Sequence, residues 1–235
     1  MRVRAFTIDL AGKRGYDLIV ADPEATVQDY LDALEQLTMN DSIYLSRNVG
    51  GQCEGCDRCC GERIPLTYID ILRLKRSQYL QKVTGGRVDL RYILDRFCYV
   101  VVEGPSVDIM LRTGEDGYCI FLDRKERRCF VYPYRPLVCQ SFFCCPSSRK
   151  ARKLREAIVN QGEDELVRKW LLDAGYHGED LLIHEACDPK VNPDDWPPNC
   201  FTGKRYYWEV RLADLCSPSL WRKLTLLSNQ KRLKG

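Results

Sequence analysis

The sequence predicts an α+β fold in which a small cysteine-cluster domain lies between an N-terminal ββαβ element and a C-terminal helical segment. Three observations support this fold class. Residues 2–45 alternate between strand, turn and helix signals, residues 149–174 carry helical periodicity, and most of the 13 cysteines fall between residues 53 and 145. We therefore expect an N-terminal element over residues 1–50, a cysteine-cluster metal-binding domain over 51–148, and a helical and irregular extension over 149–235.

The N-terminal element begins with two predicted strands, residues 2–10 and 16–21, joined by a glycine-containing turn. Asp22 can cap the helix that follows, and Pro23 suits its first turn. The apolar face of this helix recurs at helical spacing in Val27, Tyr30, Leu31, Leu34 and Leu37. With a third strand at 43–45, the order resembles the first half of a ubiquitin-like β-grasp fold, and a small αβ cap on the metal domain is the alternative that we favour.

The rest of the chain carries clear helix and strand signals. Thr67 and Asp70 form a capping-box pattern that predicts a helix through residue 82, ended by Gly85 and Gly86. The further expected elements are a short helix at 89–97, strands at 98–103, 107–113 and 118–122, helices at 149–160 and 163–174, a proline-rich loop at 188–199, and a last helix from Pro218.

The composition argues against several classes of protein. Hydrophobic residues make up 45% of the 235 residues, enough for a core that does not need metal in order to fold. A net charge of +3 is too small to indicate nucleic-acid binding. No run approaches the roughly 20 apolar residues of a membrane span, and the start of the chain lacks the apolar core of a signal peptide. We therefore expect a cytoplasmic protein without a membrane partner.

The number of cysteines stands out for such a protein. In a reducing compartment, dense cysteines are more often metal ligands or redox groups than disulfides. Only two histidines, His177 and His184, accompany them, so any site must be rich in thiolate. Thiolate ligands favour zinc, iron–sulfur clusters or Cu(I) over hard metals such as Mg²⁺.

The densest cysteine group is the run Cys53-x2-Cys56-x2-Cys59-Cys60. This spacing lets one tight loop direct successive sulfurs at a common point, and bacterial ferredoxins use it to supply three ligands to a [4Fe–4S] cluster. Structural zinc sites more often use two separated Cys-x2-Cys pairs. The spacing therefore favours iron–sulfur over zinc. Because neighbouring side chains in an extended segment point to opposite faces, one member of the pair Cys59 and Cys60 could serve a second site.

A second group consists of Cys119, Cys129 and Cys139, with nine residues between neighbours. Cys119 is expected in a strand, and Cys129 follows a charged turn. Cys139 is expected in the first turn of a short helix that begins near Pro136, which should lower the pKa of its thiol.

These motifs resemble a known family. The residues that carry the resemblance are Cys53 to Cys60 with Ile64-Pro65-Leu66-Thr67, Cys119-Ile120-Phe121-Leu122, Cys129 with Tyr132, and Arg135-Pro136-x2-Cys139 with Phe142. Together they resemble the YkgJ-type cysteine-cluster family, which is described as a zinc- or iron-chelating domain. The resemblance covers about residues 51–145. It implies metal binding by seven cysteines: Cys53, Cys56, Cys59, Cys60, Cys119, Cys129 and Cys139. This chain has Asp57 and Gln140 where the family often has Gly and Arg. These departures leave the thiols intact.

Three functional hypotheses follow. The leading one is a metal-binding protein with an iron–sulfur cluster, [4Fe–4S] first, or zinc, which acts in redox chemistry with a protein partner. The second is a metal-dependent oxidoreductase or protein-modifying enzyme, because a related cysteine-cluster class methylates flagellin lysines. The third is a metal chaperone or store.

Several other residues remain open to interpretation. Cys144 and Cys145 could extend the site, and Cys98 is expected to be a packing residue. His184, Cys187 and Cys200 could form a second zinc-like site, although we favour His184 and Cys187 on one core-facing side of a helix. The basic run at 149–155 could bind phosphate or an acidic partner, although a solvated helix face is the commoner explanation of such a run. Tyr206-Tyr207-Trp208 is more readily explained by a buried strand than by base stacking.

Overall fold

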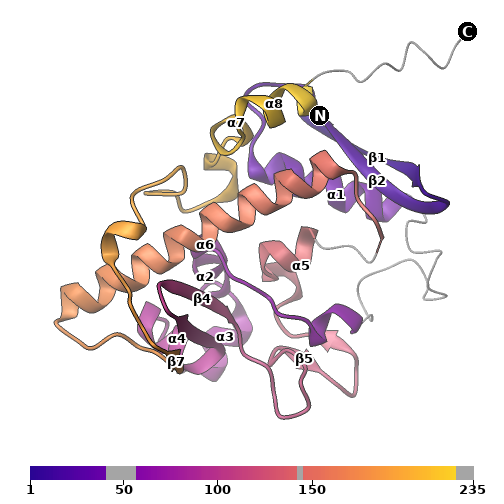
Figure 1. Ribbon diagram of the computed structural model, residues 1–235. Helices are drawn as coiled ribbons and strands as arrows, with labels where there is room; N and C mark the ends of the chain where they lie inside the picture. The colour runs from indigo at the N-terminus through magenta and orange to yellow at the C-terminus, as the bar shows by residue number, and fades with distance from the viewer. Residues whose placement is uncertain (41–56, 142–144, 226–235) are drawn as a thin grey trace, which may run out of the picture. The chain divides into compact units, whose positions relative to one another are not determined.

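The computed structural model describes residues 1–40, 57–141 and 145–225 (Figure 1). The chain divides into two compact units. Unit 1 combines residues 1–52, 140–158 and 206–235, and unit 2 combines residues 53–139 and 159–205. Helices and small sheets occur in the same chain, so the predicted α+β class is confirmed. Among the described residues, no helix has both the length and the apolar character that crossing a membrane requires.

Unit 1 is built on a β-hairpin. Strands β1 (Val3–Leu10) and β2 (Lys13–Val20) pair antiparallel, from Val3 opposite Val20 to Leu10 opposite Lys13. The two turn residues, Ala11 and Gly12, both have positive φ, as a tight hairpin turn demands, and Asp9 accepts a hydrogen bond from the Gly12 amide at 2.9 Å. The two predicted strands are confirmed, whereas the third, at 43–45, lies outside the described residues.

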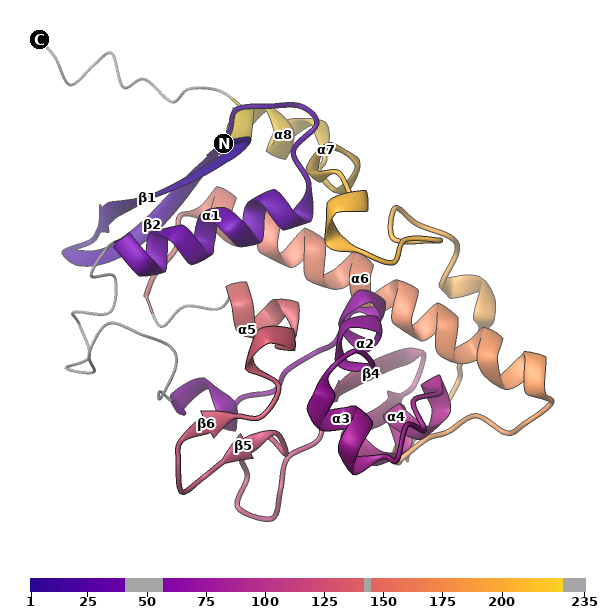
Figure 2. The same cartoon turned by 180° about the vertical axis from the view of Figure 1, so that it is seen from behind.

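Helix α1 (Val27–Asn40) lies along this hairpin (Figure 2). It begins later than the Asp22–Pro23 pattern predicted. Asp22 instead closes a turn by accepting hydrogen bonds from the amides of Glu24 and Ala25. Thr26 precedes the helix and exchanges hydrogen bonds with Asp29 in a capping box, with the Thr26 amide 2.8 Å from an Asp29 carboxylate oxygen.

The C-terminal part of unit 1 returns to the start of α1. The Val27 amide donates to the carbonyl of Val210 at 2.9 Å, and the Leu212 amide donates to that of Ala25 at 2.8 Å. Helices α7 (Leu212–Leu215) and α8 (Pro218–Thr225) follow, and α8 begins where the sequence predicted. Tyr206-Tyr207-Trp208 form no strand: Tyr207 is buried in a 3-10 turn, whereas Trp208 is exposed and stacks on Tyr206.

After the 3-10 helix η2 (Arg58–Gly61), unit 2 continues with three short α-helices, α2 (Tyr68–Leu74), α3 (Gln78–Val83) and α4 (Leu90–Phe97). The capping box of Thr67 and Asp70 is confirmed at the start of α2. The single helix predicted through residue 82 is interrupted after Leu74, where the amides of Arg76 and Ser77 bond three residues back instead of four. Gly85 and Gly86, both with positive φ, end α3 as predicted.

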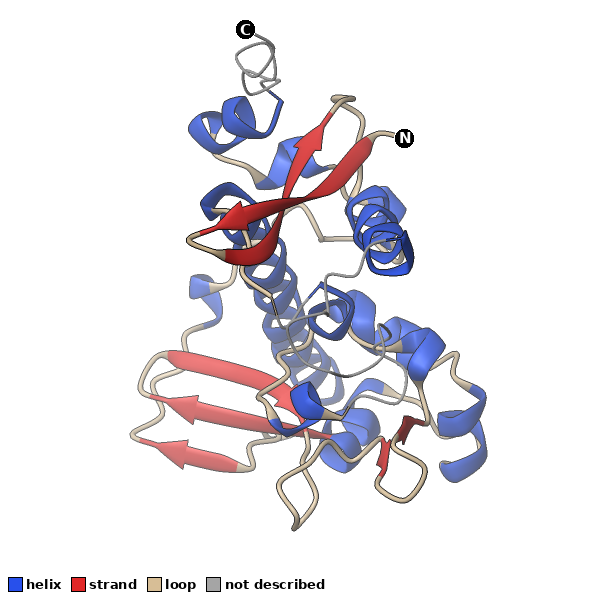
Figure 3. Ribbon diagram, turned by 90° about the vertical axis from the view of Figure 1, so that its right-hand side faces the viewer, coloured by secondary structure: helices blue, strands red, loops and turns tan. Residues whose placement is uncertain are grey.

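A three-stranded sheet with the order β4-β3-β7 follows (Figure 3). The predicted antiparallel pair is confirmed as β3 (Cys98–Glu103) and β4 (Ser106–Leu111). The sequence did not predict β7 (Glu185–Cys187), which pairs in parallel with β3. Alternate β3 residues, Cys98, Val100 and Val102, are fully buried in the core of unit 2, as is Leu166 of helix α6 (Arg149–His177).

The segments predicted as helices at 149–160 and 163–174 form one continuous helix, α6 (Arg149–His177). Gly162, which separates the two predictions, lies against Thr67: a Cβ at this position would be 2.5 Å from the Thr67 methyl carbon. The glycine therefore serves close packing and does not end the helix.

Candidate metal centre

The cysteines of the two sequence motifs converge on one cavity in unit 2. Its volume is about 60 Å³, and a water needs roughly 10–15 Å³ by this measure, so several small groups fit. Five thiols line it together with apolar side chains and two arginines. The cysteines are Cys59, Cys60, Cys119, Cys129 and Cys139, and the arginines are Arg127 and Arg135.

Cys59 and Cys60 lie in a short 3-10 helix, η2 (Arg58–Gly61). The Cys60 carbonyl accepts a hydrogen bond from the Cys119 amide at 2.7 Å, which joins the first motif to the second. The chain thus folds back so that the two cysteine motifs meet. Cys53 and Cys56, the other two predicted ligands of this loop, lie outside the described residues.

Asp57 attaches the same loop to a charged turn. Its carboxylate accepts from Arg127 at 2.9 Å and from Arg124 at 3.2 Å. The hydrogen bond from Arg127 is the main cause that lowers the pKa of Asp57. Arg124 also lies over the ring of Tyr118, the neighbour of Cys119, at 3.5 Å from its centroid. We did not predict this attachment from the sequence, although an acidic residue inside the cysteine run and the charged turn at 123–128 were a signal for it.

A short hairpin positions Cys129. Strands β5 (Leu122–Asp123) and β6 (Arg128–Cys129) pair so that Cys129 lies opposite Leu122. Asp123 closes the turn by accepting from the amides of Lys125 at 2.9 Å and Glu126 at 3.2 Å. The strand predicted at 118–122 is therefore wrong in extent. Cys119 lies before the hairpin and makes only an isolated bridge to Thr113.

Cys139 lies on α5 (Leu137–Ser141), whose start is held by Asp70. One Asp70 oxygen accepts from the Leu137 amide at 2.8 Å, and the other accepts from both the amide and the hydroxyl of Thr67 at 3.0 Å. Asp70 is fully buried. The carboxylate that caps α2 therefore also fixes the start of the helix that carries Cys139.

The predicted lowering of the Cys139 pKa is wrong. Burial, followed by the neighbouring thiols of Cys119, Cys59 and Cys129, raises the pKa of Cys139 well above its ordinary value. Burial also raises the pKa of Cys119 to about 11. A five-residue helix does not offset the loss of water around these thiols. Four thiols that influence one another in this way lie close together in a poorly hydrated space.

Two cationic side chains, Arg127 and Arg135, border the cavity. Arg135 lies over the ring of Tyr132, at 4.2 Å from the centroid, and donates to the Tyr132 carbonyl at 3.2 Å. The Arg135 charge opposes the burial that raises the pKa of Cys129. Such guanidinium groups favour the thiolate form that metal ligation requires.

The donor set fits a soft metal in its chemistry, because the convergent donors are all thiols. Within residues 57–141 and the other described segments, however, no three Cys, His, Asp or Glu side chains lie at the spacing of a metal shell. The assignment of the seven cysteines as ligands therefore remains a prediction. Its complete donor set includes Cys53 and Cys56, which precede the described loop.

The remaining cysteines play other parts. Cys98 is fully buried in β3, in agreement with its predicted packing role. His184 accepts a hydrogen bond from the Val100 amide through Nδ1 at 3.0 Å, and the Cys200 thiol lies 3.0 Å from Gln161. Cys187 is exposed on β7, so the favoured interpretation, a core-facing helix with His184, is wrong: the segment is a strand paired with β3. Cys144 lies outside the described residues.

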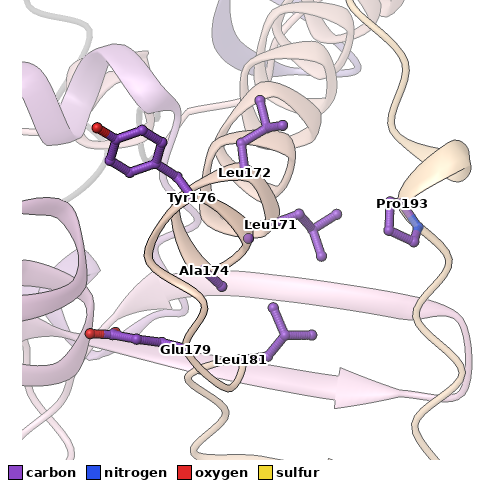
Figure 4. Close-up of a pocket in the computed structure, with 8 residues that line it drawn as sticks. Leu171, Leu172, Ala174, Tyr176, Glu179, Leu181 and Pro193 are labelled. Atoms are coloured by element: carbon purple, nitrogen blue, oxygen red, sulfur yellow. The ribbon is translucent and has the colours of Figure 1, made fainter.

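A second hollow in unit 2, at the end of α6, has a different character. Its volume is about 760 Å³, and Figure 4 shows Leu171, Leu172, Leu181 and Pro193 among its lining residues. Among the described residues that line it, Glu179 is the only carboxylate and there is no thiol. This apolar hollow lacks the donors of a metal site.

Comparison with known families agrees with the donor chemistry. Residues 52–164 match the CxxCxxCC family model, described as a "Putative zinc- or iron-chelating domain", which confirms the resemblance stated from the sequence. Neither the curated proteins nor the solved structures include a significant match.

Proposed function

We propose that the zinc- or iron-chelating segment of this chain holds an iron–sulfur cluster, with zinc as the second candidate. The observation that carries the proposal is the convergence of five thiols from distant parts of the sequence on one cavity with room for more than a bare ion. Cys59, Cys119, Cys129 and Cys139 would hold the group, and Cys53 and Cys56 would complete the donor set from the adjoining loop. A bound cluster would supply one-electron redox chemistry.

The residues around the cavity would support such a centre in separate ways. Asp70 would hold the start of the Cys139 helix, and Asp57 would hold the loop of Cys59 and Cys60. Arg127 and Arg135 would balance thiolate charge. Each of the five cysteines retains partial exposure, which supports electron exchange with a protein partner in a reducing, cytoplasmic compartment.

Anaerobic purification followed by metal and sulfide analysis tests the proposal. We expect iron and acid-labile sulfide, and a broad visible absorption that dithionite bleaches. Stoichiometric zinc in a colourless protein would reject the cluster and keep the thiolate site. Protein without bound iron or zinc, even after anaerobic reconstitution, would reject both.

A further inference from the structure

A basic cavity in unit 1 takes no part in the thiolate site. Its volume is about 950 Å³, and it lies between the first turns of α6, helix α8 and Asp17 of β2. Four cationic side chains line it, Arg149, Lys150, Lys153 and Lys223, against two acidic ones, Asp17 and Glu156. The basic run that the sequence shows at 149–155 thus contributes one wall of a concave site.

The positive charge of this cavity is only partly neutralised. Lys150 already forms an ion pair: its ammonium lies 3.3 Å from the carboxylate of Asp17, and both side chains are mostly buried. Arg152, outside the cavity, pairs with Glu156 at 3.7 Å. In the part of the chain that the structure describes, no ion pair involves the side chains of Arg149, Lys153 or Lys223, and all three residues are exposed. Arg149, Lys153 and Lys223 therefore line one cavity, and none of the three forms an ion pair within the described residues.

Hydroxyl groups accompany these cations. Ser217 and Ser219 line the same cavity, and their Oγ atoms lie 3.2 Å apart at the start of α8. A phosphate group offers only acceptor oxygens, so it can receive hydrogen bonds from both hydroxyls while the ammonium and guanidinium groups balance its charge. The volume lies in the range of small-molecule sites.

We propose that this cavity binds a small soluble molecule that carries a phosphate group. Arg149, Lys153 and Lys223 supply the charge, and Ser217 and Ser219 supply neutral donors. Lys150 stabilises one side of the cavity through its ion pair with Asp17. The site is independent of the thiolate centre, since none of its lining residues belongs to unit 2.

Calorimetric titration of the full-length protein, in the metal state in which it is purified, tests this inference. The probes are inorganic phosphate and fructose 1,6-bisphosphate at low ionic strength. We expect saturable binding that K153A/K223A weakens about tenfold or more, as loss of charge-assisted hydrogen bonds predicts. The matched control K13A/R222A removes two exposed charges from the same unit but none from the cavity lining, and it should bind like the wild type.

The alternatives give distinguishable results. Absence of saturable binding to either phosphate probe, or equal weakening in both double variants, would overturn the proposal. Equal binding of hexaglutamate would show a general anionic surface and overturn the phosphate assignment. Binding to phosphatidic acid vesicles without binding to either soluble probe would overturn the soluble-ligand assignment. Thermal unfolding of both double variants checks that each is folded. We expect both to fold, because the substituted side chains are exposed.

Discussion

At the scale of single residues, three of the cavity thiols are unusual, because burial raises the pKa of Cys119, Cys129 and Cys139. Burial raises the pKa of Cys119 to about 11, and Cys59, Cys119 and Cys129 add to the burial that raises the pKa of Cys139. A group of neutral thiols in this space has no evident packing advantage over apolar side chains. A bound cation changes the balance, since it compensates thiolate charge as the protons leave.

Substitution of the predicted ligands tests this arrangement directly. Cys59→Ser or Cys139→Ser should sharply lower the metal content per chain, because each removes a soft donor from the cavity. Cys187→Ser is the matched control, since Cys187 is exposed and outside the cavity lining. Metal analysis after anaerobic purification provides the measurement. Full metal content in Cys139→Ser would remove the second motif from the site.

Asp70 should affect both stability and metal retention. Asp70→Asn replaces one carboxylate oxygen with an amide donor that faces the donors of Thr67 or Leu137. We expect a loss of about 1–3 kcal/mol in the free energy of unfolding, the usual cost of an unsatisfied buried group, and faster loss of metal to a chelator.

Asp89→Asn is the control for Asp70→Asn. Asp89 caps α4 by accepting from the Tyr92 amide at 2.8 Å, but it has no link to α5. It should leave metal retention unchanged. If both variants lost metal at the same rate, Asp70 would not position the Cys139 helix.

Glu163 gives a prediction about pH. Burial, then the carboxylates of Asp108, Asp164 and Asp70, raises the pKa of Glu163 from 4.5 to about 8. Between these two values the folded protein holds a proton that the unfolded chain releases, so this group lowers stability progressively as pH rises from 4.5 to 8. Glu163→Gln removes that penalty.

Urea unfolding of wild type and Glu163→Gln on either side of this window provides the measurement. The variant should gain stability relative to wild type when pH rises from about 4.5 to above 8. Other titrating groups cancel in the comparison. Parallel pH profiles for wild type and Glu163→Gln would contradict the prediction.

At the scale of elements, side-chain capping patterns locate helix starts more reliably than single residues do. The box of Thr67 and Asp70 predicted the start of α2 correctly. The same pattern, Thr26 with Asp29, marks the true start of α1, whereas the predicted cap Asp22 only closes a turn. Strand β7 could not be predicted locally, because its three residues are all exposed and lack alternation. This segment is a strand only because it pairs with β3.

Helix α6 offers an internal comparison of two glycines. A Cβ at Gly162 would lie 2.5 and 2.8 Å from carbons of Thr67, the residue that caps α2, whereas nothing lies within 4 Å at Gly175. Gly162→Ala should therefore destabilise the protein although alanine is the better helix former. Gly175→Ala should be neutral or stabilise by up to about 1 kcal/mol. Urea midpoints measure both, and a stabilised Gly162→Ala would show that Thr67 can move aside.

At the scale of the whole molecule, the sequence predicts which residues could form the site but not how they are held. Both cysteine motifs were evident from spacing and neighbouring residues, and five of the seven predicted ligands line one cavity. The attachment of Asp57 to Arg124 and Arg127 spans about 70 positions, and local periodicity contains no information at that range. The link from Asp70 to Leu137 has the same character.

The last prediction concerns metal removal. The core of unit 2 consists of apolar side chains such as Leu66, Ile93 and Val100, all fully buried, so the metal is not needed to form it. Chelation under reducing conditions should leave most of the far-ultraviolet circular dichroism intact. Hydrogen exchange should quicken at residues 57–60 and 118–139, where the thiols are anchored. Strands β3 and β4, whose amides pair within the sheet, should keep their protection. Cooperative unfolding of the sheet on chelation would instead show that the centre is structural for all of unit 2, as in domains that fold only with zinc.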